Sequence, residues 1–430
     1  MDAIKAIMKK RIRGWLGRFW KILGPGVITG ASDDDPSGIV TYAIAGAKGG
    51  FSLLWTAWLT TPLMAAVQEM CARIGIVTGK GLAGVMKRRY PRPLLWLVAI
   101  LVVGANTINI GANIGGMAEA TALLVPLPQI FLGFVFTILI VGLMIYLPYR
   151  KIAGSLKWLT FALFAYILAA FASRPDWLVV LSQTFTPKIQ WNGETLVLLT
   201  AILGTTISPY LFFWQTSEEV EERTEKSRFR FQHHIVTRQE LKQMREDVNL
   251  GMVFSNLVMF FIMVNAGTVF HSRGITELAT AGQVASALEP LVGQFASIIF
   301  SLGIIGTGLI SIPVLAGSAA YVAAETFGLS EGLGKRFQQA RAFYGIIALA
   351  TFVGFAMNFF GISPVRALFA TAVIFGLIAP LLILLILDIA NRREVMGGKI
   401  NNWFQNLLGS AAFLIMFFSA LATGAVFLVK

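Results

Sequence analysis

The stretch GPGVITGASDDDPSGIVTY, residues 24–42, decides the fold of this chain. It begins and ends as an apolar helix, but Asp33, Asp34, Asp35 and Pro36 stand in its middle. A carboxylate is costly in the hydrocarbon of a bilayer, and a proline inside a helix breaks it. A broken membrane helix with a carboxylate at the break is typical of the cation sites of secondary transporters.

The rest of the chain has the composition of a membrane protein. Hydrophobic residues make up 56% of the 430 residues and charged residues only 13%, whereas a soluble domain has about 25% charged residues. Apolar runs of the roughly 20 residues that cross a bilayer as a helix predict an all-α protein with eleven membrane spans. They are 23–47, 51–77, 94–123, 129–148, 153–172, 194–217, 249–269, 286–325, 341–359, 363–389 and 403–428.

The basic residues predict the orientation in the membrane. Residues 1–22 are basic and amphipathic and show no small-residue cleavage site, so we expect a cytoplasmic interfacial segment and not a signal peptide. KRRYPR (87–92) and NRREVMGGK (391–399) fall in loops on the same side. We therefore expect a plasma (inner) membrane protein with its N-terminus inside and its C-terminus outside. The net charge of +13 then reflects topology and attraction to anionic lipid, and nucleic-acid binding is disfavoured.

Few residues in the chain suit catalysis. Cys71 is the single cysteine, and His233, His234 and His271 all fall in predicted loops. A disulfide, a cysteine metal cluster and a catalytic triad at membrane depth are therefore excluded within one chain. We expect no enzyme and no resident cofactor.

A second helix break is predicted within 194–217. Here GTTISP (204–209) interrupts the apolar run, and Pro209 has no N–H with which to continue the helix. The two breaks are five spans apart, which is the spacing of two inverted five-helix repeats. Two ordinary proline kinks are the alternative. The expected repeats are 23–172 and 194–389, followed by one extra helix at 403–430.

At these breaks the chain resembles the NRAMP family of divalent-metal transporters. GPG followed by a DPGN-type break is a hallmark of that family and stands here within 24–38, and VQEMCARIGIVTGKGLA (67–83) is also similar. The resemblance covers nearly the whole chain. It implies a LeuT-type fold with broken helices 1 and 6, and alternating access around a central metal ion, which is substrate and not cofactor.

The metal ligands of the family are only partly kept. The family uses an aspartate and an asparagine from DPGN, a backbone carbonyl, and a methionine from an MPH motif. The resemblance places the aspartate at Asp35, the asparagine position at Gly38, the carbonyl at Thr205 and the methionine position at Ser208. The sulfur ligand and one oxygen ligand are therefore absent.

This ligand set favours a hard cation. Mg²⁺ prefers oxygen ligands and keeps part of its water shell, and Mn²⁺ is similar in hardness, whereas a thioether suits softer metals. Asp33 and Asp34 are expected either to accept hydrogen bonds from metal-bound water or to form a solvated acidic rim. The further candidates near the site or along the ion pathway are Ser37, Thr206, Asn106, Asn109, Asn113, Tyr210 and Gln215.

The proton-coupling residues of the family are also replaced. The histidine positions of the sixth span correspond to Tyr210 and Gln215, neither of which exchanges protons near pH 7. In the third span, Asn106, Asn109 and Asn113 share one helix face. They line a polar path or make hydrogen bonds between helices. The acidic positions of the family fall on Asn109 and Ala112.

These departures fit the NRAMP-related magnesium transporter branch: uptake of partly hydrated Mg²⁺, and also Mn²⁺, across the lipid bilayer without protons. Several alternatives stay open. They are a proton-coupled Mn²⁺/Fe²⁺ transporter, an amino-acid transporter of the same fold, a cation channel, and a non-transporting membrane metal sensor or intramembrane enzyme.

Charged residues at the span ends have simpler interpretations. Glu69 and Arg73 lie four residues apart and are expected to pair. Asp388 is expected to pair with the arginines at 392–393. Glu218, Glu219, Glu221 and Glu222 predict a solvated helix end or, alternatively, a region that attracts cations leaving the protein.

Overall fold

The structure, a computed structural model, describes residues 25–147, 163–186, 189–228 and 236–429, and all regular structure in this part of the chain is helical. The helices of the first half are α2 (Pro25–Asp33), α3 (Pro36–Gly49), α4 (Trp55–Thr78), α5 (Leu82–Arg89), α6 (Arg92–Ala122), α7 (Gln129–Tyr146), α9 (Phe164–Ala172) and α10 (Trp177–Phe185). Those of the second half are α11 (Gly193–Thr206), α12 (Pro209–Arg228), α13 (Arg238–Val269), α14 (Ala281–Ala285), α15 (Glu289–Val292), α16 (Ala296–Phe327), α17 (Arg341–Ala356), α18 (Pro364–Asn391), α19 (Arg393–Met396) and α20 (Trp403–Val429).

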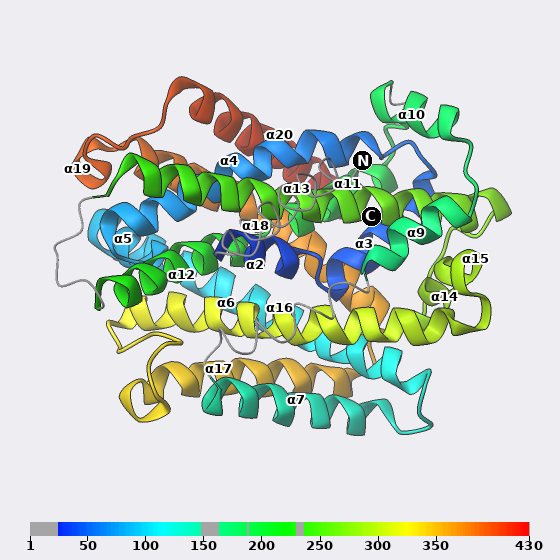
Figure 1. Cartoon of the computed structure of the whole chain (residues 1–430), viewed down its shortest axis with the longest axis horizontal. Helices are drawn as coiled ribbons and strands as arrows, with labels where there is room; N and C mark the ends of the chain where they lie inside the picture. Colours follow the sequence, from blue (N-terminus) through cyan, green and yellow to red (C-terminus); the bar gives the residue numbers. More distant parts are fainter. Residues whose placement is uncertain (1–24, 148–162, 187–188, 229–235, 430) are drawn as a thin grey trace, which may run out of the picture.

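The long helices lie side by side along the long axis of the molecule, with α2 and α3 near the centre (Figure 1). Eight helical stretches in the described residues are long and apolar enough to cross a membrane. The stretch that contains α11 and the apolar part of α12 is the most enclosed, with 89% of its apolar window buried, and α20 is the least, with 17%. The two broken helices therefore form the interior of the bundle, and α20 lies on its outside.

The predicted spans correspond to helices where the structure describes them, but several of their ends differ. The helix predicted to end at 217 continues as α12 to Arg228, and α13 begins at Arg238 rather than at 249. A capping box of Thr237 and Glu240 starts α13, because each side chain bonds the backbone N–H of the other. The span predicted to start at 286 begins as short helices, and its long helix α16 starts at Ala296.

Two predictions concern residues that the structure describes only in part or not at all. Of the span predicted at 153–172, α9 is described and 148–162 lies outside the described residues. The interfacial segment predicted at 1–22 lies wholly outside them.

The two predicted charge pairs have different outcomes. The pairing of Asp388 with Arg392 is confirmed, with 2.7 Å between Oδ2 and Nε. The pairing of Glu69 with Arg73 is wrong, because the Glu69 carboxylate bonds Arg245 of α13, at 2.8 Å. Periodicity within one helix could not reveal this partner, which is 176 residues away.

Candidate metal site at the two broken helices

The first broken helix ends α2 at Asp33 and begins α3 at Pro36. Asp35 stands between them with an extended backbone, φ −69° and ψ 169°. Proline forces this conformation on the residue before it, and a proline is well tolerated in the first turn of the new helix. The prediction of a break at this position is therefore confirmed, and its cause is local.

Asp35 caps α3 and gathers four hydrogen-bond donors. Its Oδ1 accepts from Ser37 Oγ (2.6 Å) and from the backbone N–H of Gly38 (2.8 Å). Its Oδ2 accepts from the side-chain amides of Asn113 (2.9 Å) and Asn109 (3.1 Å). Asp35 is only 1% exposed, so these donors and the positive end of the α3 dipole offset part of the cost of burying a carboxylate.

The asparagine side chains of α6 form hydrogen bonds to other helices and to Asp35. Asn109 also accepts a hydrogen bond from Thr371 of α18 (2.9 Å), and Asn106 donates to the carbonyl of Leu315 in α16 (3.1 Å). The predicted face of asparagines therefore makes interhelical hydrogen bonds, and two of its three members hold Asp35. Asn106 bonds a different helix.

The second break separates α11 from α12 at residues 207–208. Ser208 precedes Pro209, and its hydroxyl donates to the carbonyls of Thr205 (2.7 Å) and Gly204 (3.0 Å). These carbonyls have lost their helical N–H partners because the helix stops here. The hydroxyl of Thr206 bonds the carbonyl of Ile202 within its own helix, at 2.7 Å.

The two breaks meet beside Gly38. A Cβ added to Gly38 would stand 3.3 Å from Thr205 Oγ1 and 3.2 Å from the Asp33 carbonyl. Asp35 bonds Gly38, Gly38 lies beside Thr205, and Ser208 bonds the Thr205 carbonyl, so the four residues predicted as the metal site are successive neighbours. Carboxylate, hydroxyl and carbonyl oxygens at these positions suit a hard divalent cation that keeps some of its water.

Asp33 and Asp34 face α13. Ser255 Oγ lies 2.6 Å from Asp33 Oδ2 and 3.3 Å from Asp34 Oδ1. Both aspartates are 0% exposed, so the prediction of a solvated acidic rim is wrong. Asp33 Oδ1 and Asp34 Oδ2 have no hydrogen-bond partner within the described residues. The sequence does not indicate Ser255 as a partner, because it is 222 residues from Asp33 and 221 from Asp34.

Tyr210 and Gln215, both in α12, form hydrogen bonds to the first broken helix. The Tyr210 hydroxyl donates to the Ser32 carbonyl (2.8 Å), and Thr29 donates to Gln215 Oε1 (2.5 Å). Gln215 also donates to Glu219 of its own helix, at 2.9 Å. The resemblance places the histidines of the family at these two positions. Here the side chains hydrogen-bond α2 to α12 and make no hydrogen bond to Asp35.

A cavity of about 500 Å³ lies where α12 and α16 end. This is the end of the bundle that carries α5, at the left of Figure 1. We call it the acidic vestibule, because five glutamates and one lysine line it. They are Glu218, Glu221, Glu225, Glu325, Glu331 and Lys335.

Two of the glutamates of the acidic vestibule are tied to backbone. Glu221 accepts from the N–H groups of Leu333 (2.7 Å) and Gly334 (2.9 Å), and Glu325 accepts from Gly84 (2.9 Å). Glu218 is only 9% exposed. The prediction of a simple solvated helix end at Glu218–Glu222 is therefore wrong, since these residues lie within α12 and are enclosed by loops and helices distant in sequence.

A bundle of membrane-spanning helices, two of them broken around a buried carboxylate, defines the architecture of a LeuT-type secondary transporter. The sequence matches the family profile "Natural resistance-associated macrophage protein-like" over residues 26–425. The chain belongs to this family, NRAMP, whose members are divalent metal cation transporters, and it is not an enzyme.

Individual proteins support the same assignment. The chain is 27% identical to the divalent metal cation transporter MntH of Klebsiella pneumoniae subsp. pneumoniae, covering 92% of this chain and 91% of that protein. It is 29% identical to MntH of Chromohalobacter salexigens, covering 91% and 87%.

Solved structures show a similar fold. The manganese transporter of Eremococcus coleocola superposes with a TM-score of 0.76 at 20% identity, over 95% of this chain and 88% of that one. The inward-facing structure of Mhp1 superposes with a TM-score of 0.58 at 12% identity, over 94% and 91%. At these identities the likeness concerns the fold alone.

Proposed function

We propose that this transporter carries a hard divalent cation, Mg²⁺ and also Mn²⁺, as a partly hydrated ion and without coupled protons. The observation that supports this most is the kind of oxygen donor at the two breaks. These donors are the Asp35 carboxylate, the Thr205 hydroxyl beside Gly38, and the Ser208 hydroxyl on the Thr205 carbonyl, at the position where the resemblance places the thioether of the family. Without the sulfur, the site loses its preference for softer metals.

The proposal includes the orientation of the protein in the membrane and its division into two inverted repeats. The basic loops favour a cytoplasmic N-terminus and an external C-terminus in the plasma (inner) membrane, with inverted repeats at 23–172 and 194–389. An inside-negative potential then favours entry of a divalent ion by about 4.6 kcal/mol per 100 mV, twice the single-charge value. Such a driving force makes proton coupling unnecessary for uptake.

A proton-coupled Mn²⁺ transporter is the second candidate. The relatives named above are called MntH and manganese transporter, and Asp33 and Asp34 place two titratable groups at membrane depth against one hydroxyl, that of Ser255. Neighbouring buried carboxyl groups strongly influence each other's protonation. Asp33 and Asp34 are therefore the residues that would carry protons if metal uptake were coupled to protons.

The deciding experiment is uptake into proteoliposomes with one dye for internal Mg²⁺ and another for internal pH. We expect saturable Mg²⁺ entry without acidification, and Mn²⁺ that competes for the same site. Acidification that follows metal entry and disappears in Asp33→Asn or Asp34→Asn would establish the proton-coupled candidate instead. Mn²⁺ entry without any Mg²⁺ entry would contradict the proposed selectivity.

We also propose that the acidic vestibule is the cytoplasmic end of the ion pathway. Burial and the nearby Glu325 carboxylate raise the pKa of Glu331 to about 8. Glu331 is therefore mostly neutral below pH 8 and gains its negative charge as the pH rises above that value. A cation is attracted more strongly by the ionised form.

Metal flux that starts from the vestibule side should depend on pH accordingly. In inside-out vesicles, we expect Mg²⁺ flux to rise about two- to fivefold between pH 7 and 9, and we expect Glu331→Gln to flatten this rise. Glu289→Gln is the matched control, because α15 lies at the opposite end of the bundle (Figure 1). If Glu331→Gln left the pH profile unchanged, the proposal that the acidic vestibule is part of the ion pathway would be contradicted.

A further inference from the structure

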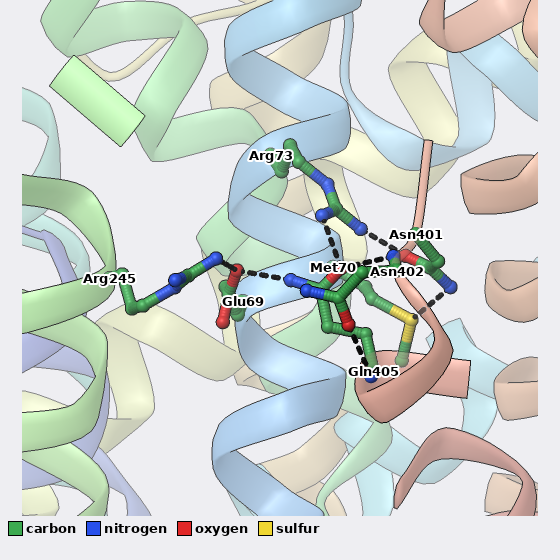
Figure 2. Close-up of polar contacts among 7 residues, drawn as sticks. All are labelled: Glu69, Met70, Arg73, Arg245, Asn401, Asn402 and Gln405. Atoms are coloured by element: carbon green, nitrogen blue, oxygen red, sulfur yellow. Dashed lines mark hydrogen bonds and ion pairs between the residues drawn. The ribbon is translucent and has the colours of Figure 1, made fainter. Parts of the chain in front are cut away.

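A second cavity, of about 180 Å³, lies between α4, α13, α20 and the segment that precedes α20. Glu69 and Arg73 of α4 line it together with Arg245 of α13, Lys399 and Gln405. Figure 2 shows how these side chains meet: Glu69 lies between Arg245 and Gln405, and Arg73 reaches Gln405 and Asn401. We call this the basic pocket.

Arg73 is the buried charge of the basic pocket, with only 5% of the residue exposed. Its Nη1 donates to Gln405 Oε1 at 2.8 Å, and its Nη2 donates to Asn401 Oδ1. Both acceptors are neutral amides. Its Nε has no hydrogen-bond partner within the described residues.

The carboxylate of Glu69 is already used by other groups. Its Oε1 accepts from Arg245 Nη2 (2.8 Å) and from Gln405 Nε2 (2.6 Å). Lys399 adds a third cation to the lining. Three positive side chains and one negative one therefore surround the basic pocket, which leaves an excess of two positive charges.

An uncompensated buried charge is costly, and a bound counter-ion lowers that cost. Guanidinium groups bind phosphate particularly well, because their planar donors match its oxygens. The cavity is smaller than the pockets of about 300–1,000 Å³ that enclose drug-sized ligands, so it suits a phosphate group rather than a whole nucleotide. A metal cation is disfavoured by the net positive charge.

We propose that the basic pocket binds a phosphate group, supplied by the headgroup of an anionic phospholipid. Glu69 and Arg73 lie in the second half of a membrane-length helix, and Lys399 lies just before α20, so the pocket opens where helices leave the apolar part of the bundle. Basic pockets between membrane helices at this depth recognise lipid headgroups. A bound headgroup would join α4, α13 and α20.

Binding can be measured on the purified, delipidated protein without any transport assay. Thermal unfolding is followed with short-chain phosphatidylglycerol, with phosphatidylcholine of the same chain length, and with inorganic phosphate. We expect phosphatidylglycerol to raise the Tm more than phosphatidylcholine does. Protection by phosphatidylglycerol but not by inorganic phosphate identifies lipid as the source, whereas protection by inorganic phosphate alone identifies free phosphate.

Variants test whether the basic pocket is responsible. Lys399→Gln is expected to weaken the phosphatidylglycerol effect about tenfold in concentration, the value of one charge-assisted hydrogen bond. Arg73→Lys keeps the charge but loses the planar fork, and it should weaken binding as well. The matched control is Lys242→Gln, on the exposed face of α13 and outside the pocket. Equal protection by both lipids, or an unchanged response in Lys399→Gln, would overturn the proposal.

Discussion

Asp35→Asn is expected to abolish divalent-cation uptake while the protein still folds. Asparagine also caps helices, so its side-chain oxygen can replace Asp35 Oδ1 as the acceptor for Ser37 and Gly38. Its NH2 replaces Oδ2 and cannot accept from Asn109 and Asn113, so the Asn113 amide, whose oxygen has no other partner in the described residues, must turn to accept from it. The change removes the negative charge that the two breaks surround. Losing one member of a buried, hydrogen-bonded charge pair costs about 2–5 kcal/mol, which is at least about a thirtyfold loss of affinity.

The measurement is metal binding by calorimetry together with Mg²⁺ and Mn²⁺ uptake into proteoliposomes. Asp176→Asn is the matched control, since Asp176 caps α10 in an exposed connection with the same kind of hydrogen bonds. A normal rate of uptake in Asp35→Asn, with Asp176→Asn also unchanged, would remove Asp35 from the site. A loss in both variants would instead point to a general defect in the protein.

The position of this site could be predicted from the sequence because its causes are local. Pro36 and Pro209 each force a break on the residue before them, and Asp35 caps the helix that follows at once. The same holds for the membrane spans, whose apolar runs are continuous in the chain. Family resemblance then adds Thr205 and Ser208 as candidate metal ligands.

Contacts between distant segments could not be predicted in this way. Ser255 bonds Asp33 across 222 residues, and Gln405 bonds Glu69 across 336. In both cases the acidic residue stands out in the sequence but its partner does not, because the sequence of a long helix does not show which distant residue a polar side chain will contact. The acidic vestibule and the basic pocket are built from such contacts.

Gly204→Leu is expected to prevent the protein from folding. A Cβ added at Gly204 would lie 2.1 Å from the Ala372 carbonyl oxygen and 2.3 Å from the Gly376 nitrogen, both of them backbone atoms of α18. Small residues allow membrane helices to approach this closely. A leucine would have to push α11 and α18 apart. Because the atoms it meets belong to the backbone and cannot rotate away, the cost exceeds the roughly 1–3 kcal/mol that is typical of an overpacked core.

The control is Gly104→Leu, which makes the same substitution in the membrane-length helix α6 where nothing lies within 4 Å of an added Cβ. We expect that variant to elute as wild type in size-exclusion chromatography and to keep its Tm, while Gly204→Leu aggregates. A folded Gly204→Leu with an unchanged Tm would show that α11 and α18 do not touch as described.

The smaller change Gly204→Ala connects this contact to the metal site. Gly204 precedes Thr205, whose carbonyl is a proposed metal ligand, and α18 carries Thr371, which bonds Asn109 and through it Asp35. The alanine Cβ would itself stand 2.1 Å from the Ala372 carbonyl oxygen, far inside ordinary contact distance, so α11 and α18 must separate. That separation would move oxygen donors on one side of the site and the support of the carboxylate on the other. We expect Gly204→Ala to bind metal more weakly and to lower the Tm as well, though less than Gly204→Leu does, because alanine adds only the Cβ to the crowded contact with α18.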